Sequence, residues 1–282
     1  MKTSVELALS SINAEDHIKT VQPVSGGSIS SAYYVETTSE RFFVKLHEEA
    51  PKDFFSQEAG GLQFLEETHT LAVPEVLGWG KKFIVMEWVE GEATNKTEEM
   101  LGTRLAQLHS HHGTYFGLEA DNFIGELPQS NGWEKTWGDF LREKRLKPQF
   151  DLARSLGRLS GQRGSKSQKL LEKVDELVPP DRKPSRLHGD LWGGNWIAGP
   201  GGEPFLIDPA VFYGDYEFEI AFMDLFGGFS PRVYGAYQES KELEPDFEDR
   251  KPLYQLYYLL VHLNIFGESY GRSVDKILNK YV

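Results

Sequence analysis

The stretch that decides the fold reads RLHGDLWGGNW, residues 186–196, and it is followed by FLIDPA at residues 205–210. Acid and amide side chains, which are costly to bury, stand there beside two tryptophans and three glycines. Asn195 follows Asp190 by five positions, and Asp208 follows Asn195 by thirteen. Such residues can act simply as helix caps and turn formers, but three of them at these spacings favour a reactive site.

The same five-position offset separates the Asp and the Asn of the kinase catalytic loop, H-R-D-x-x-x-x-N. In that loop the Asp accepts the proton of the substrate hydroxyl, while the Asn and a later Asp hold magnesium. The pattern therefore predicts Asp190 as the catalytic base. It predicts Asn195 and Asp208 as ligands of Mg²⁺, a hard cation that prefers oxygen donors.

A Gly-Gly turn lies between strand-like segments in PVSGGSISSAYYV, residues 23–35. Backbone N–H groups exposed at such a turn can bind phosphate oxygens, which makes Gly26, Gly27 and Ser28 candidates for covering the phosphates of a nucleotide. The turn matches neither G-x-G-x-x-G nor a Walker A sequence, so an ordinary hairpin turn is the alternative interpretation.

Lys45 stands in the apolar run RFFVKL, residues 41–46, where a lysine is costly to bury unless it is paired. Glu58 lies in the next helix-like segment and is the candidate partner. In kinases, a strand lysine of this kind holds nucleotide phosphates and is positioned by a helix glutamate. The alternative is a lysine on an edge strand with its ammonium group in solvent.

The composition argues against several classes of function. The 282 residues include no cysteine, which excludes disulfides, thiolate metal sites and cysteine nucleophiles. A net charge of −13 argues against binding to nucleic acid or to anionic lipid. No apolar run approaches the roughly 18 residues that span a bilayer, and the N-terminus has no signal-peptide pattern. We therefore expect a cytoplasmic protein with no nucleic-acid or membrane partner.

Strand and helix patterns divide the chain into two predicted lobes, which gives an α+β fold class. Residues 1–90 are rich in strands and turns, and an apolar strand ends there in a polar step at about 87–90 that we interpret as the boundary between the lobes. Residues 91–282 are mostly helical. The charged motif residues fall on strands and turns, and we expect them to line a cleft between the lobes.

Particular elements follow from the same patterns. Aromatic and β-branched residues predict a hairpin at 31–37 and 41–46, and apolar spacing predicts helices at 56–68 and 251–271. The segment SGQRGSKSQ, residues 160–168, is read as a polar loop because of its Gly and Ser content.

Longer stretches resemble the fructosamine kinase family. The resemblance is carried by LHGDLWGGNW (187–196), LIDPAVFYGDYEFEIA (206–221) and LFGGF (225–229), and it extends along nearly the whole chain. HGD-x-x-x-x-N alone indicates only the wider group that includes choline and aminoglycoside kinases. The additional stretches DNFIG (121–125) and LFGGF are far more specific to the family.

The resemblance implies a protein kinase-like, two-lobed fold. It implies phosphorylation of the sugar 3-hydroxyl of ketoamines, the adducts of sugars with amines, with ATP and Mg²⁺ as cofactors. The phosphorylated adduct is unstable and releases the amine, so the implied activity repairs glycated amines. The partners are then ATP and a glycated amine, either a small molecule or a protein lysine.

The resemblance also assigns roles to individual residues. Asp190 is implied as the catalytic base, Asn195 and Asp208 as the metal ligands, and Lys45 with Glu58 as the pair that anchors phosphate. The implied hinge, which meets adenine through backbone groups, consists of Glu87, Trp88 and Val89. Many family members carry cysteine at the position of Ser28, so thiol-based control of the phosphate loop is not expected here.

The acceptor pocket is less well defined by the sequence. Trp192 lies two residues beyond Asp190, and its indole can pack on a sugar and attract an ammonium group; packing in the interior of the lobe is the alternative. Asn122 is a candidate sugar ligand only because DNFIG resembles the family. Asp215 is expected to anchor the catalytic loop through hydrogen bonds.

Two other functions stay open at this level. One is a kinase for another amine-bearing metabolite, such as an amino alcohol or an aminoglycoside. The other is a nucleotide-binding protein without catalysis, against which the joint presence of Lys45, Asp190, Asn195 and Asp208 argues. The sequence does not indicate which ketoamine is preferred or the oligomeric state.

Overall fold

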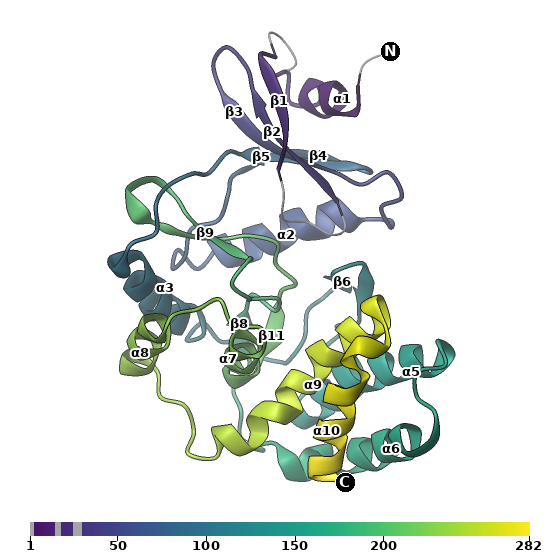
Figure 1. Ribbon diagram of the computed structural model, residues 1–282. Coiled ribbons are helices and arrows are strands. Elements are labelled where there is room, and N and C mark those ends of the chain that lie inside the picture. The colour runs from purple at the N-terminus through teal and green to yellow at the C-terminus, as the bar shows by residue number, and fades with distance from the viewer. Residues whose placement is uncertain (1–2, 15–17, 25–29) are drawn as a thin grey trace. The chain divides into compact units, whose positions relative to one another are not determined.

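The computed structural model describes residues 3–14, 18–24 and 30–282 (Figure 1). The expected phosphate loop, with Gly26, Gly27 and Ser28, lies outside the described residues. The chain forms two compact units, and neither is one continuous segment. The first joins residues 1–105 with 194–209 and 230–237, and the second contains the remainder, residues 106–193, 210–229 and 238–282.

The first unit is built on an antiparallel sheet with the strand order β1-β2-β3-β5-β4 among the described residues. Its elements are α1 (Ser4–Ser10), β1 (Thr20–Val24), β2 (Ser31–Glu36), β3 (Arg41–Leu46), α2 (Phe54–Glu66), β4 (Val76–Gly80), β5 (Phe83–Glu87), β9 (Trp196–Ala198), η2 (Pro200–Gly202) and β10 (Pro204–Leu206). The division between the units falls within α3 (Asn95–Leu108) and α8 (Pro231–Ser240).

Helices cover both faces of this sheet because side chains alternate along its strands. On one face, α1 packs against buried apolar residues of β2, β3 and β5, among them Val35, Val44 and Val85. On the other face, α2 packs against Ile84 and Met86 of β5. Lys45 is adjacent to Val44 in β3 and therefore points to the face that α2 covers.

The second unit is mainly helical. Its elements are β6 (Asn122–Ile124), β7 (Leu127–Gln129), α4 (Trp137–Phe140), the π-helix η1 (Leu141–Leu146), α5 (Lys147–Ser155), α6 (Gly161–Leu177), β8 (Ser185–Leu187), β11 (Phe212–Gly214), α7 (Tyr216–Leu225), α9 (Phe247–Phe266), η3 (Glu268–Tyr270) and α10 (Gly271–Tyr281). Aromatic rings form its core around Phe218 of α7, whose ring lies 5.4 Å from Trp137 and 5.2 Å from Tyr258.

The structure confirms the predicted hairpin, which is β2 and β3, and the predicted helices, which are α2 and α9. The interpretation of residues 160–168 as a loop was wrong, because these residues form the first turns of α6. No helix in the described ranges is both long enough and apolar enough to cross a membrane.

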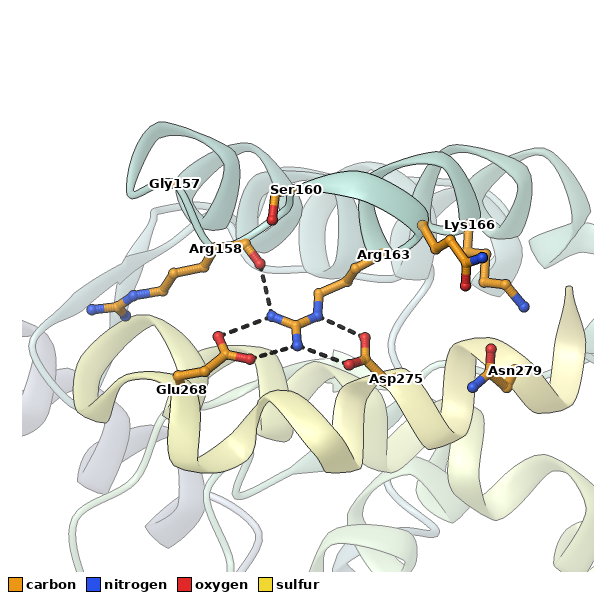
Figure 2. Close-up of a pocket in the computed structure, with 9 residues that line it drawn as sticks. Gly157, Arg158, Ser160, Arg163, Lys166, Glu268, Asp275 and Asn279 are labelled. Atoms are coloured by element: carbon orange, nitrogen blue, oxygen red, sulfur yellow. Dashed lines mark hydrogen bonds and ion pairs between the residues drawn. The ribbon is translucent and has the colours of Figure 1, made fainter.

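Arg163 explains why this Gly- and Ser-rich segment is helical. Its guanidinium donates two hydrogen bonds to Asp275, two to Glu268 and one to the carbonyl of Arg158, at 2.6–3.0 Å (Figure 2). All five guanidinium donors are thereby used, and α6 is fastened to η3 and α10. A polar cavity of about 370 Å³ opens beside this junction, and we interpret the arginine within it as a structural tie.

Candidate active site

The two expected metal ligands lie at the same end of one hairpin. Strands β9 and β10 pair antiparallel with Trp196 opposite Leu206. One position further along, the N–H of Ile207 donates to the carbonyl of Asn195 at 3.1 Å. Asp208 is the next residue after Ile207. The strand register therefore brings Asn195 and Asp208, which come from two separate motifs, to the same end of the hairpin. A further bond, from Leu206 N–H to the carbonyl of Ala72, holds the hairpin within the first unit.

Asp208 has a left-handed backbone conformation, with φ of 55°. Asp tolerates this region better than most residues, and such conformations cluster at functional sites. Its side chain is 40% exposed. Asp208 is thus a carboxylate that the chain holds open to solvent in an uncommon backbone conformation.

Lys45 binds two carboxylates from different segments. Its Nζ lies 2.7 Å from Oε1 of Glu58 on α2, and it also pairs with Oδ1 of Asp208. The side chains of Lys45 and Glu58 are each 11% exposed. The structure therefore joins the predicted strand lysine to its predicted helix glutamate and, in addition, to the predicted metal ligand.

The charge state of this cluster follows from its contacts. Burial acts to lower the pKa of Lys45, but the opposite charges of Asp208 and Glu58 outweigh it, and the pKa is raised overall. Burial raises the pKa of Glu58, and the neighbouring Lys45 opposes that shift. Lys45 is therefore a fixed ammonium at neutral pH, which suits a role in binding phosphate.

The expected hinge begins at Glu87, the last residue of β5, and continues beyond the strand through Trp88 and Val89. The backbone N–H of Glu87 donates to the carbonyl of Glu75 at 3.0 Å, and that of Trp88 donates to the carbonyl of Arg41 at 3.2 Å. Among the described residues, the backbone of Val89 makes no hydrogen bond. Of the three expected hinge residues, Val89 is therefore the one whose backbone N–H and carbonyl are not engaged within the described part of the chain.

Asp190 lies in the second unit, in the loop that follows β8. Its backbone N–H donates to Nδ1 of His188 at 3.2 Å, and His188 is fully buried. The His188 ring thus makes a structural hydrogen bond within the loop. Asp190 itself is partly exposed.

The residue that anchors this loop is Glu219 of α7, which the sequence analysis did not single out. Its carboxylate accepts hydrogen bonds from the backbone N–H of Gly189 at 2.6 Å and of His188 at 3.3 Å. A third contact, at 2.8 Å, comes from Nε2 of His109. Glu219 and His109 are both fully buried. Because a carboxylate only accepts, Nε2 of His109 carries the hydrogen.

The contacts of Glu219 also determine its ionisation. Burial by itself raises the pKa of this carboxyl group. The hydrogen bond and charge interaction with His109, with smaller contributions from His188 and Gly189, outweigh burial and lower the pKa overall. Glu219 is therefore an ionised carboxylate that holds the backbone of the loop carrying Asp190, and we regard it as a positioning residue.

Asp215, the anchor that the sequence analysis expected, has different contacts. Its carboxylate accepts from Tyr254 Oη at 2.7 Å and from the backbone N–H of Glu217, and it pairs with Arg182. It caps α7 and joins a buried ionic network. The expected contact with the catalytic loop is made by Glu219 instead. The sequence signal for Glu219 was its place among the apolar residues of EFEIA, residues 217–221. An acid in such a position is costly to bury unless it is paired.

Trp192 is 39% exposed although it is a large aromatic residue. It is followed by Gly193, which lies against the backbone of Gly228. A Cβ built on Gly193 would come within 2.6 Å of the Cα atom of Gly228. The indole is thus presented on the surface of the second unit by a loop whose backbone is tightly packed.

Asn122 lies in the interior and is 5% exposed. Its Nδ2 donates to the carbonyl of Val211 at 3.0 Å, and its Oδ1 accepts from Gln129 and Asn131, each at 2.9 Å. This placement favours a role in holding the segments around β6 and β11 together, and it argues against the direct contact with sugar that we expected.

Solved structures of other proteins share the fold of this chain. A choline kinase from Streptococcus pneumoniae, 14% identical, superposes with a TM-score of 0.61 over 98% of each chain. With its small antiparallel sheet and mainly helical second unit, the chain has the α+β, protein kinase-like fold that the sequence predicted.

The particular family follows from closer relatives. The sequence pattern of the family described as fructosamine kinase matches residues 1–282, and the chain belongs to this family. A probable ketoamine kinase from Enterococcus faecium is 40% identical over 93% of this chain and 95% of its own length. A chloroplastic protein-ribulosamine 3-kinase from Oryza sativa is 35% identical, covering 93% and 78%. A candidate fructosamine-3-kinase structure from Thermobifida fusca is 32% identical, with a TM-score of 0.84 over 93% of each chain. The chain is accordingly a phosphotransferase that acts on a sugar hydroxyl.

Proposed function

We propose that this protein transfers the γ-phosphoryl group of ATP to the sugar 3-hydroxyl of a ketoamine, and that the product releases its amine. The observation that supports this most strongly is the cluster in which Lys45 joins Glu58 to Asp208, with Asn195 beside Asp208 on the same hairpin. The names of the relatives from Enterococcus faecium and Oryza sativa support a ketoamine as the acceptor.

The donor atoms fit Mg²⁺. Asp208 supplies carboxylate oxygens and Asn195 an amide oxygen, and hard cations prefer such donors. Lys45 uses Oδ1 of Asp208, while no other group in the described part of the chain bonds Oδ2. When bound, Mg²⁺ neutralises charge that develops on the phosphates.

The remaining roles belong to the side chains of the protein. Lys45, held by Glu58, places a positive charge against the phosphates, and the backbone of Val89 holds the adenine. Asp190 takes the proton of the acceptor hydroxyl. The hydroxyl oxygen of the acceptor bonds to the γ-phosphorus as the bond from that phosphorus to ADP breaks and ADP leaves. Positioning and charge neutralisation supply most of the rate enhancement in reactions of this type.

The proposal is tested by following ADP release with MgATP and a panel of acceptors. We expect turnover with the ribulose and fructose adducts of lysine and none above background with unmodified lysine. Choline and an aminoglycoside belong in the same panel, because the fold is shared with kinases of other amine-bearing molecules. Faster turnover of choline or the aminoglycoside, or no turnover of either sugar adduct, would refute the proposal.

A further inference from the structure

We propose that an aromatic strip on the second unit, formed by Phe226, His262, Phe266 and Tyr270, binds the substituent carried by the nitrogen of the ketoamine. The strip would then determine which glycated amines are accepted. This inference rests on the proposed function and adds to it the residues that bind the amine portion of the ketoamine.

The four rings of the aromatic strip follow one another in contact. Phe226 lies 4.5 Å from His262 between ring centroids, and His262 lies 5.5 Å from Phe266 and 5.0 Å from Tyr270. These distances fall in the range of favourable aromatic pairs. Phe226 comes from the LFGGF stretch, to which the proposed mechanism assigns no role, and the other three come from α9 and η3.

The strip is exposed although its rings are held in place. Phe226 is 41% exposed and Phe266 is 54% exposed. Phe226 also meets Phe222 edge to face at 5.9 Å, so its ring is fixed from behind. Clustered exposed apolar surface marks interaction sites, and aromatic side chains provide contact area at low entropic cost.

The loop that carries Phe226 is seated on the loop that carries Asp190. Gly193 and Gly228 approach so closely that neither has room for a side chain. Gly227 and Gly228 have φ values of 70° and 93°, which a residue with a side chain rarely adopts. The glycine contact therefore places the loop that carries Phe226 beside the loop that carries Asp190 and the exposed Trp192.

A second connection runs through Tyr258. Its hydroxyl donates to the carbonyl of Gly189 at 2.8 Å, and its ring stacks on Phe222 at 3.6 Å. The carbonyl of Tyr258 accepts from Nδ1 of His262 at 2.8 Å. The backbone of the catalytic loop and the imidazole of the strip are thus held by the same residue.

The charge of the strip suits a cationic partner. Burial lowers the pKa of His262, so the imidazole is neutral near pH 7 and the four rings carry no positive charge. Aromatic faces attract an ammonium group and pack on methylene chains. A ketoamine nitrogen with an alkyl substituent offers both, whereas sugar hydroxyls and phosphates call for several polar donors and the strip offers mainly aromatic faces.

The test compares two ribulosamines that differ only beyond the nitrogen, one made from methylamine and one made from Nα-acetyl-lysine amide. For the lysine adduct, we expect Phe226→Ala and Phe266→Ala each to raise KM about fivefold, equivalent to about 1 kcal/mol, with kcat unchanged. For the methylamine adduct, KM should not change. Phe226→Leu, which keeps apolar contact with Phe222 but removes the aromatic face, should fall between wild type and Phe226→Ala.

Tyr115→Ala is the matched control, because Tyr115 is an aromatic residue of the same unit, 44% exposed, outside the strip. It should leave KM for both adducts unchanged, and thermal melts identify any variant that is merely unstable. Equal KM changes for both adducts, or none for the lysine adduct, overturn the inference. It is also overturned if Phe266→Ala dissociates a wild-type dimer and leaves KM unchanged, because the strip is then an interface between copies. A wild type that phosphorylates neither adduct refutes the proposed function itself.

Discussion

Replacing Glu219 by Gln tests whether this carboxylate positions the catalytic loop. The carboxylate accepts from Gly189, His188 and His109 in a fully buried site. Glutamine keeps one carbonyl oxygen and turns an NH₂ group toward at least one of these donors. A buried donor left without an acceptor costs about 1–3 kcal/mol, and bonds to a charged group contribute about 1.5–3 kcal/mol.

We therefore expect Glu219→Gln to lower the free energy of unfolding by about 2–4 kcal/mol. This corresponds to a Tm lower by roughly 5–12 °C for a protein of this size. Displacement of the loop by even part of that energy should reduce kcat by about 10- to 100-fold, since about 1.4 kcal/mol is a factor of ten. Steady-state kinetics with a ketoamine and a thermal melt measure both effects.

Glu217→Gln is the matched control, because Glu217 is a buried acid of the same helix, α7. Its carboxylate pairs with Arg182 and Arg250, and within the described part of the chain it makes no hydrogen bond or ion pair with the loop that carries Asp190. It should lower Tm to a similar extent while kcat stays within about threefold of wild type. If Glu219→Gln keeps full kcat, or if both variants lose kcat equally, Glu219 has no specific positioning role.

The pH dependence of stability gives a second check on Glu219. Its pKa is lowered in the folded protein, so its stabilisation is complete above its usual value of 4.5 and is lost as pH falls through the lower folded value. The difference in stability between wild type and Glu219→Gln should accordingly be largest near neutral pH and shrink below pH 4.5. A difference that grows under acid would contradict the assignment.

Three further results are expected. Asp208→Ala should weaken binding of MgATP at least tenfold while binding of magnesium-free ATP changes less, as measured by calorimetry, because the carboxylate holds the metal; equal affinities would place the metal elsewhere. Trp192→Ala should raise KM for ketoamine about tenfold with KM for ATP unchanged, and Trp192→Phe should recover part of the loss; parallel loss for both substrates would indicate a packing role. Activity should be equal in dithiothreitol and in mild peroxide, because the chain has no cysteine; a peroxide-induced loss that dithiothreitol reverses would contradict this.

Local sequence patterns predicted the contacts of the site where a residue type has few structural roles in its context. A lysine between apolar strand residues needed a partner, and Glu58 on α2 provides it. Asn195 and Asp208 were proposed from spacing, and the register of β9 and β10 brings them together. In each case the sequence alone indicated both the functional residue and the partner that it needs.

Contacts between distant segments could not be predicted in the same way. Glu217 and Glu219 lie two positions apart in one helix, and only the tertiary structure separates the partner of Arg182 from the partner of Gly189. The Gly and Ser content at the start of α6 favours a loop locally. The helix forms there because Arg163 binds carboxylates about 105 residues later in the chain, which a local pattern cannot show. The return of residues 194–209 to the first unit likewise depends on long-range packing.

The central claim is that this chain phosphorylates a ketoamine with Asp190 as the base. The most direct measurement compares wild type with Asp190→Asn for transfer of labelled γ-phosphate from ATP to ribulose-lysine, alongside the Kd of each for MgATP. The account predicts that the variant forms the phosphorylated sugar about 10²- to 10⁴-fold more slowly, with Kd for MgATP unchanged within a factor of about three. A labelled product formed at a rate within a few-fold of wild type would contradict it, as would a wild type that forms no labelled product.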